Sequence, residues 1–294
     1  MSDIFGSIAH ILGGLLLFLY NNLWFSYGLA IILLTIIIKS VLLPLSIKSF
    51  KSMAKMHEVQ PVLNEIQRKY KNDKEALNRE MMKVYKEKKI NPFGGCLPML
   101  LQIPILYGLF LVISQPLTFM YNYPEISKTQ IFAKYVSVNS YYKEVEFLVK
   151  AQDNKKILED VEKEIKEKNK ITKDYANLKN MNLIFLGINL GDIPKIIPPK
   201  DNTTKYIILW IIPILAGVST YYSSKFSQMP TQQIEQSEIQ SSMQKQMMIM
   251  MPLMAAYFSF VVPVGLSLYW LISNIYQLIQ QKYLINLYIN KKEA

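Results

Sequence analysis

The stretch Tyr27–Ile47, YGLAIILLTIIIKSVLLPLSI, decides the fold because it is apolar and long enough to cross a bilayer. It carries a single charge, on Lys39. A charged side chain in mid-membrane costs about 2.5–3.5 kcal/mol on insertion scales, so it normally faces a protein interior or a water-filled cavity. A lone cation at this depth therefore predicts a protein that attracts an anionic group into the bilayer.

The composition agrees with a membrane protein that crosses the bilayer several times. Of 294 residues, 51% are hydrophobic and only 19% are charged, which is unlike a soluble domain. The net charge of +11 would be compatible with a protein that binds nucleic acid. However, the cations lie near membrane ends or among acidic residues, so lipid head groups and topology explain them and no nucleic-acid partner is expected. A single cysteine, Cys96, excludes an internal disulfide.

Hydropathy predicts an all-α protein with five membrane spans. The first span is residues 26–47, the second lies in residues 91–115, and the third is 206–224. Residues 247–283 contain the fourth and fifth spans, joined by a tight turn at Pro263-Val264. Residues 1–25 precede the spans and are expected to form an amphipathic helix on one membrane surface. A short extra span over residues 4–20 is the alternative.

The distribution of lysine and arginine predicts the orientation. Segment 48–90 holds 12 basic and 6 acidic residues, and the tail 284–294 adds Lys291 and Lys292. The Pro263-Val264 turn and the residues before the first span have none. Short basic segments stay in the cytoplasm, so the N-terminus is expected outside and the C-terminus inside. Loop 225–246 is then cytoplasmic and segment 116–205 extracytoplasmic.

Two segments between the spans have the apolar spacing of helices. In 48–90 the spacing predicts a cytoplasmic hairpin of two antiparallel helices packed along one stripe, or a pair that merely connects two spans. The residues of this stripe are Met53, Met56, Val59, Leu63, Ile66, Tyr70, Leu77, Met81 and Val84. In 116–205 the same spacing predicts a charged helical insertion. Its apolar face comprises Leu158, Val161, Ile165, Ile171, Tyr175 and Leu178.

Polar side chains share faces of three predicted spans. Helical spacing places Thr35, Lys39 and Ser46 on one face of the first span. Gln102 is the strongly polar residue of the second span, and the last span has a polar stripe of Ser267, Trp270, Asn274, Gln277 and Gln281. Together these residues predict a hydrated, cation-bearing groove that binds substrate. The alternatives are that Lys39 extends to the head groups and that the other residues form hydrogen bonds between helices.

The sequence offers little for covalent catalysis. Two histidines and one cysteine are too few for a His/Cys metal cluster or a Cys–His pair, and no glycine-rich phosphate loop occurs. We expect a protein that is not an enzyme and that has no metal or cofactor. Methionines crowd the inner end of the fourth span, between Met243 and Met254. They fit ordinary core packing or an adaptable surface for apolar chains.

Four ordered motifs resemble the YidC/Oxa/Alb family of membrane protein insertases. The most specific is Asn91–Pro104, NPFGGCLPMLLQIP, which resembles the entry to the family's second core span. The others are Tyr27–Leu45 around Lys39, Ser52–Pro61 in the cytoplasmic hairpin, and Pro263–Asn274 in the last hairpin. The family cation is usually arginine. Lysine keeps the charge but lacks the planar guanidinium fork.

The resemblance implies a five-helix core around a groove that is open to the cytoplasm and to lipid. Its members insert and fold newly made membrane proteins, alone or beside the Sec translocon. We therefore expect an insertase and chaperone of the bacterial plasma membrane. Nascent membrane proteins and the bilayer are the expected partners, with the translocon and the ribosome as candidates. The short tail 284–294 argues against firm ribosome tethering.

Two alternatives come from other classes of protein. A small-solute transporter or channel subunit would have inverted repeats or discontinuous spans around a midplane site, and no repeat is visible in the sequence. A structural scaffold held by its helical hairpin would not require Lys39.

Overall fold

A computed structural model describes residues 2–22, 26–91, 97–169, 175, 178, 181–197, 203–227 and 238–288. These residues form helices and one short pair of strands, so the predicted all-α class is confirmed. The contacts divide the chain into two compact units. The first contains residues 1–37, 103–216 and 255–273, and the second contains residues 38–102, 217–254 and 274–294.

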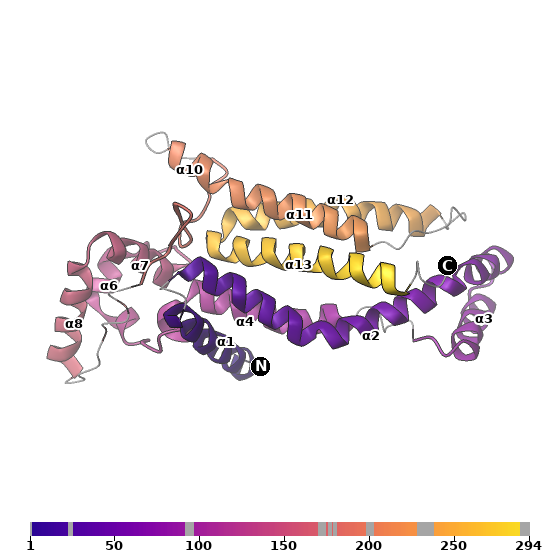
Figure 1. Ribbon diagram of the computed structural model, residues 1–294, viewed down its shortest axis with the longest axis horizontal. Coiled ribbons are helices and arrows are strands. Elements are labelled where there is room, and N and C mark those ends of the chain that lie inside the picture. The colour runs from indigo at the N-terminus through magenta and orange to yellow at the C-terminus, as the bar shows by residue number, and fades with distance from the viewer. Residues whose placement is uncertain are drawn as a thin grey trace. The chain divides into compact units, whose positions relative to one another are not determined.

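The first unit contains some whole helices and parts of several longer ones. It contains α1 (Ser2–Asn22), the start of α2 (Tyr27–Lys69), most of α4 (Leu97–Ser114) and α10 (Thr203–Leu209) (Figure 1). It also holds the start of α11 (Ile211–Ser227) and the turn that joins α12 (Glu238–Val261) to α13 (Val264–Tyr288). At this turn the buried Ser267 hydroxyl donates a 3.0 Å hydrogen bond to the carbonyl of Ser259, which ties α13 back to α12.

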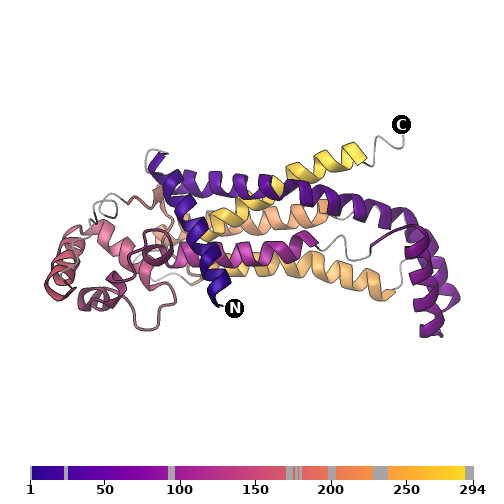
Figure 2. The same cartoon turned by 90° about the horizontal axis from the view of Figure 1, so that it is seen from below.

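Helix α1 packs one face closely on its neighbours. Figure 2 shows it lying obliquely across α4. Ala9 and Leu16 are fully buried, and Gly13 approaches the carbonyl of Phe119 so closely that a Cβ atom would clash. Phe119 ends the short α5 (Pro116–Phe119). The opposite face exposes Ile11 and other large apolar residues. Residues 4–22 are long and apolar enough to cross a membrane, so the predicted surface helix stays a prediction.

The insertion after α5 has a core of its own. It comprises η1 (Ile126–Lys128), α6 (Gln130–Tyr135), α7 (Lys143–Asp153) and α8 (Lys156–Asn169). The Glu164 carboxylate of α8 accepts hydrogen bonds from the first two amides of α6 at 2.9 and 3.1 Å. These bonds satisfy donors that a helix start leaves free. Most of the predicted apolar face is buried, namely Leu158, Val161, Ile165, Tyr175 and Leu178, whereas Ile171 lies outside the described residues.

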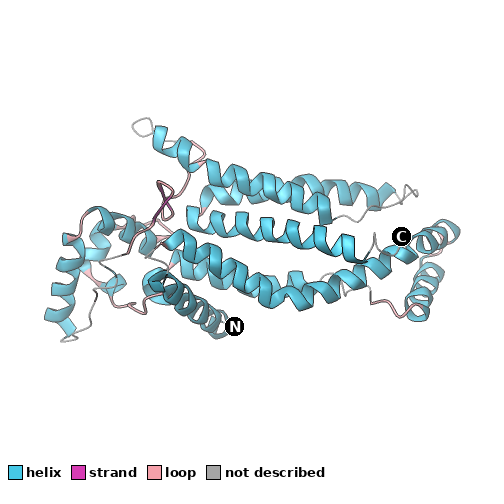
Figure 3. Ribbon diagram, in the orientation of Figure 1, coloured by secondary structure: helices cyan, strands magenta, loops and turns pink. Residues whose placement is uncertain are grey.

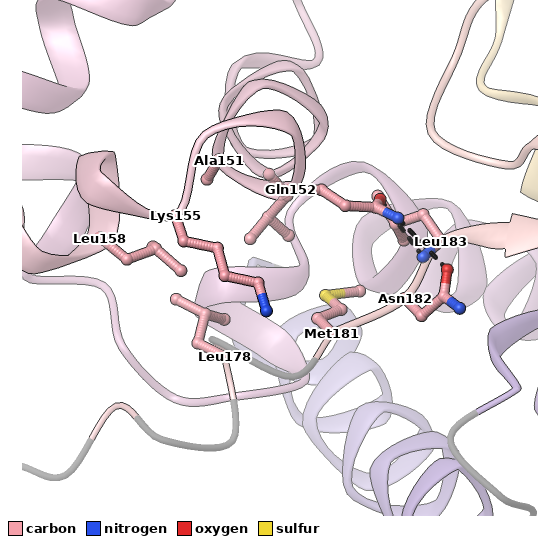
Figure 4. A pocket seen from close by; sticks show the side chains of 9 residues that line it. Ala151, Gln152, Lys155, Leu158, Leu178, Met181, Asn182 and Leu183 are labelled. Atoms are coloured by element: carbon pink, nitrogen blue, oxygen red, sulfur yellow. Dashed lines mark hydrogen bonds between the residues drawn. The ribbon is translucent and has the colours of Figure 1, made fainter.

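A cavity of about 260 Å³ lies within this insertion (Figure 4). Its walls come from α7, α8 and the segment that precedes the strands. The Lys155 ammonium points into it beside Leu178 and Met181. At its edge the Gln152 amide donates to Asn182 Oδ1 over 3.2 Å, and Leu183 N donates to Gln152 Oε1 over 3.4 Å. These bonds hold segment 181–183 against α7.

The insertion also contains a feature that the sequence did not predict. Strands β1 (Ile184–Phe185) and β2 (Ile188–Asn189) form an antiparallel hairpin in which Ile184 pairs with Asn189 (Figure 3). The prediction of helices alone in 116–205 is therefore incomplete. The turn Leu186-Gly187 permits the hairpin because both residues adopt positive φ, of 50° and 78°.

The second unit begins with the remainder of α2. Helix α2 runs on to Lys69, so the predicted first span and the first arm of the predicted hairpin are one helix. It bends by 54° at Leu42. Pro44 accounts for the bend, because its ring lacks an amide proton and clashes with the carbonyl of Ser40. Helix α3 (Lys74–Glu87) then returns beside the end of α2, capped by Asp73.

The packing of α3 on α2 uses much of the predicted stripe. Val59, Leu63 and Ile90 are buried together, and Met56, Met81, Val84 and Tyr85 pack against them. The predicted third span, 206–224, is broken into α10 and α11 at Trp210. Pro213 explains the break, because it cannot donate to the carbonyl of Leu209. Taken together, residues 204–226 remain long and apolar enough to cross a membrane.

Candidate functional site

Lys39 makes a polar contact with the second predicted span. It lies in α2, it is half-buried, and its Nζ donates a hydrogen bond to Gln102 Oε1 of α4 over 3.5 Å. This distance exceeds the range of about 2.7–3.2 Å that is usual for N–H···O bonds, so the contact is weak. Gln102 has no charge, and the ammonium keeps donors for a further acceptor. The structure therefore joins two of the predicted site residues.

The neighbouring residue connects α2 to the last helix. The Ser40 hydroxyl lies 3.2 Å from the Tyr276 hydroxyl of α13, and either oxygen can donate. Neither residue was among the predicted site residues. The backbone adds polarity here, since Pro44 has no N–H to donate to the carbonyl of Ser40. Residues 39 and 40 thus concentrate polar groups at one level of the largely apolar stretch 27–47 of α2.

Asn274 links α13 to α11. Its side chain is buried, and Nδ2 donates to Ser219 Oγ at 3.1 Å and to Thr220 Oγ1 at 2.7 Å. These bonds are the interhelical alternative given above for the last-span stripe. Sequence reasoning missed the partners on α11. Buried hydroxyls at Ser219, Thr220 and Ser223 recur at helical spacing, which is the signal that would have found them.

The other predicted site residues have local roles or no described polar contact. Thr35 is fully buried, and its hydroxyl donates to the carbonyl of Ile31 at 2.7 Å. The Ser46 hydroxyl donates to the carbonyl of Leu42 at 3.1 Å. Trp270 and Gln277 are half-buried. Thr35 and Trp270 belong to the first unit and the remaining site residues to the second, so a single groove lined by all seven stays a prediction.

Several of the long helices expose large apolar side chains. In α12, Met250, Met251 and Met254 are between 45% and 49% exposed. The side chains of Met243, Met247 and Met248 lie outside the described residues. Exposed apolar side chains on helices that bury hydroxyls and an amide and half-bury Lys39 define the class: an integral membrane protein with polar contacts between its helices.

Comparison with known proteins places the chain within that class. A model of the family described as 60Kd inner membrane protein matches residues 18–292. A relative named membrane protein insertase YidC, from Caldanaerobacter subterraneus subsp. tengcongensis, is 32% identical over 94% of this chain and 92% of its own. A relative of the same name from Clostridium tetani is 58% identical over 88 residues, or 30% of this chain and 40% of its own.

A longer relative of that name occurs in Geobacter sulfurreducens. It is 30% identical over 94% of this chain, but the match covers 36% of the relative. The chain belongs to the 60Kd inner membrane protein family, and the resemblance to the YidC/Oxa/Alb insertases is confirmed. It is accordingly a membrane protein of the bacterial inner membrane.

Proposed function

We propose that this protein inserts and folds newly made membrane proteins through a hydrated groove at Lys39. The observation that carries the proposal is half-buried Lys39, whose ammonium contacts Gln102 from within the apolar stretch 27–47 of α2. A lysine in this setting is costly and is retained where it serves a function. Family membership supports the activity, since the relatives described above are named insertases.

In this mechanism Lys39 attracts acidic residues in the polar tail of a substrate. At 4 Å and an effective dielectric of about 20, two unit charges interact by about 4 kcal/mol. That energy is enough to recruit the tail for a short time. Gln277 and the polar groups around Ser40 would keep the groove wet, which shortens the apolar distance that the tail must cross.

Release follows from the hydrophobic effect. Each large apolar side chain moved from water into lipid gains about 1.5–3 kcal/mol. A substrate span of about 20 apolar residues therefore gains far more than the loss of one contact with Lys39 costs. Neither a nucleotide nor a covalent step is required. The exposed methionines of α12 suit a surface that accepts many different apolar sequences.

The proposed topology has the N-terminus outside and the groove open to the cytoplasm and to lipid. The basic pair formed by the end of α2 and α3 then lies in the cytoplasm, where it can receive nascent chains. The Sec translocon and the ribosome are proposed as further partners.

Reconstitution of the pure protein tests the activity. A small single-span protein with an acidic tail is synthesised in the presence of liposomes that contain the chain or lack it. We expect the tail to become protected from added protease only in liposomes that contain the chain. Equal protection in empty liposomes, or none in either, would contradict the proposal. Parallel leakage of a small entrapped dye would instead indicate a channel.

A further inference from the structure

The hairpin of β1 and β2 exposes apolar side chains at its tip. Leu186 is 85% exposed and Ile184 is 50% exposed. Two-residue hairpin turns with positive φ normally contain Asn-Gly or Asp-Gly, because a leucine there is strained. At a position that faces water, this leucine would be unfavourable both for its backbone and for its side chain. Contact with an apolar environment would remove the cost of exposing the leucine side chain to water.

The base of the hairpin is fixed to the beginnings of two long apolar helices. The Phe185 ring covers Gly28 in the first turn of α2, where a Cβ atom would clash with it. On the following segment, the carbonyls of Leu190 and Asp192 accept hydrogen bonds from Gly265 N at 2.8 Å and Val264 N at 2.9 Å. These donors begin α13. Figures 1 and 3 show the strands beside the starts of α2 and α13 and near α10.

The surroundings of the hairpin have the composition of a membrane–water interface. Tyr20 of α1 accepts a 2.8 Å hydrogen bond from Asn182 N, and the Trp210 indole donates to the carbonyl of Lys195 at 2.9 Å. Lys205 pairs with Asp192 at 2.7 Å. Tyrosine, tryptophan and lysine are enriched where a membrane helix meets the head groups. Beyond Lys195 the apolar surface continues, with Ile197 86% exposed.

We propose that this surface, defined as Ile184, Leu186, Ile196 and Ile197, inserts into the lipid head-group region next to the starts of α2 and α13. Its partner is the bilayer itself, and the exposed Lys195 favours anionic head groups. The neighbouring lipid-facing side chains are Ile207, Ile208 and Ile211 of α10 and α11, each about half exposed. The hairpin thereby anchors the ends of the spans to which it is bonded.

This inference requires only that α2 and α13 enter a bilayer, so it does not depend on insertase activity. The test uses the full chain with Cys96→Ser, which removes its single cysteine. Leu186→Cys is labelled with an environment-sensitive dye and reconstituted in phosphatidylcholine–phosphatidylglycerol vesicles that carry nitroxide lipids. Val138→Cys is the matched control. Val138 is also 85% exposed, but it lies between α6 and α7, where the Ser137 hydroxyl and amide bond Glu146.

We expect a blue-shifted emission from position 186, with stronger quenching by nitroxides near the head group than by nitroxides deep in the chains. The dye at position 138 should report water and remain unquenched. Equal, water-like signals at both positions would overturn the proposal, even if position 186 became shielded on addition of a partner protein.

Leu186→Asn provides a second test, because asparagine tolerates the turn. It should preserve thermal stability in detergent and lower it in vesicles, and equal effects in both media would contradict lipid contact.

Discussion

Lys39 Nζ donates a 3.5 Å hydrogen bond to Gln102 Oε1, which joins the lysine of α2 to α4 by a neutral partner. Gln102 accepts without carrying charge, so in the proposed mechanism the ammonium stays available to an anionic group of the substrate. A carboxylate in the same place would have satisfied the lysine and removed its field. The neutral character of Gln102 therefore matters for the proposed activity, although less than the charge of Lys39.

The first prediction concerns Gln102. Gln102→Leu should lower the rate of substrate insertion about threefold, since hydrogen bonds between membrane helices contribute about 0.6 kcal/mol on average. Gln102→Glu should lower it further, because a carboxylate would pair with Lys39 and compete with the substrate. The protease-protection assay in liposomes measures both variants. A Gln102→Glu protein as active as the wild type would show that the charge of Lys39 is not used.

Asn274 is expected to act through stability. Asn274→Leu removes two hydrogen bonds, to Ser219 and Thr220, and should destabilise the protein by about 1–2 kcal/mol. Thermal unfolding in detergent measures the change. Gln277→Leu is the comparison, because the proposed groove predicts a loss of insertion there at nearly unchanged stability. If Asn274→Leu unfolded at the wild-type temperature but lost insertion, its side chain would contact substrate instead.

The third prediction is that the local stability of segment 116–205 depends on pH. Burial raises the pKa of Glu144, although Thr118 and Ser127 donate hydrogen bonds to its carboxylate that act in the opposite direction. A raised pKa in the folded state means that the folded form prefers the protonated acid. Its contribution to stability is therefore full at low pH and is lost as the pH rises from the ordinary glutamate range through the raised pKa.

Hydrogen exchange of the Thr118 amide and its neighbours measures this loss of local stability. Protection from exchange should fall as the pH rises from the ordinary glutamate range through the raised pKa of Glu144. Glu144→Gln should remove the slope. Glu146 provides an internal contrast, because burial raises its pKa but bonds from Lys150 and Ser137 outweigh burial and lower it. The contribution of Glu146 to stability is lost only as the pH falls below the ordinary pKa range of glutamate. A Glu144→Gln protein with the wild-type profile would exclude Glu144 as the source.

Two glycines give a matched test of the packing beside the hairpin. Gly28→Ala should lower the unfolding temperature, because the added Cβ would clash with the Phe185 ring. Gly14→Ala lies in α1, where nothing is within 4 Å of the new atom. It should stabilise the helix by about 0.5–1 kcal/mol. Equal shifts in the same direction would show that Phe185 does not rest on Gly28.

Residue patterns predicted the helical class and both residues of the central contact, but not that the two side chains meet. Lys39 and Gln102 were evident because a charge and an amide are conspicuous in apolar helices. Ser40, Tyr276, Ser219 and Thr220 were missed, since hydroxyl groups occur in membrane helices without any polar partner. The packing of Met56, Val59, Leu63, Met81 and Val84 followed from spacing alone, although Met53 of the same predicted stripe is exposed. No spacing identifies which helix lies opposite a given side chain.

Two local features differ from expectation for physical reasons. The hairpin at Ile184–Asn189 was missed because its tip is Leu186-Gly187, without the asparagine or aspartate that predicts such a turn. The break at Trp210 was visible in principle, because Pro213 disfavours a continuous helix. A hydropathy value is an average over a window of residues, so one proline within the window does not reveal the break.

The most direct test of the proposed mechanism compares Lys39→Leu with Lys39→Arg in a strain depleted of its own insertase, with both proteins present in the membrane at equal amounts. The mechanism requires a positive charge at this depth, so the arginine protein should restore growth and substrate insertion and the leucine protein should not. Full restoration by the leucine protein would contradict it.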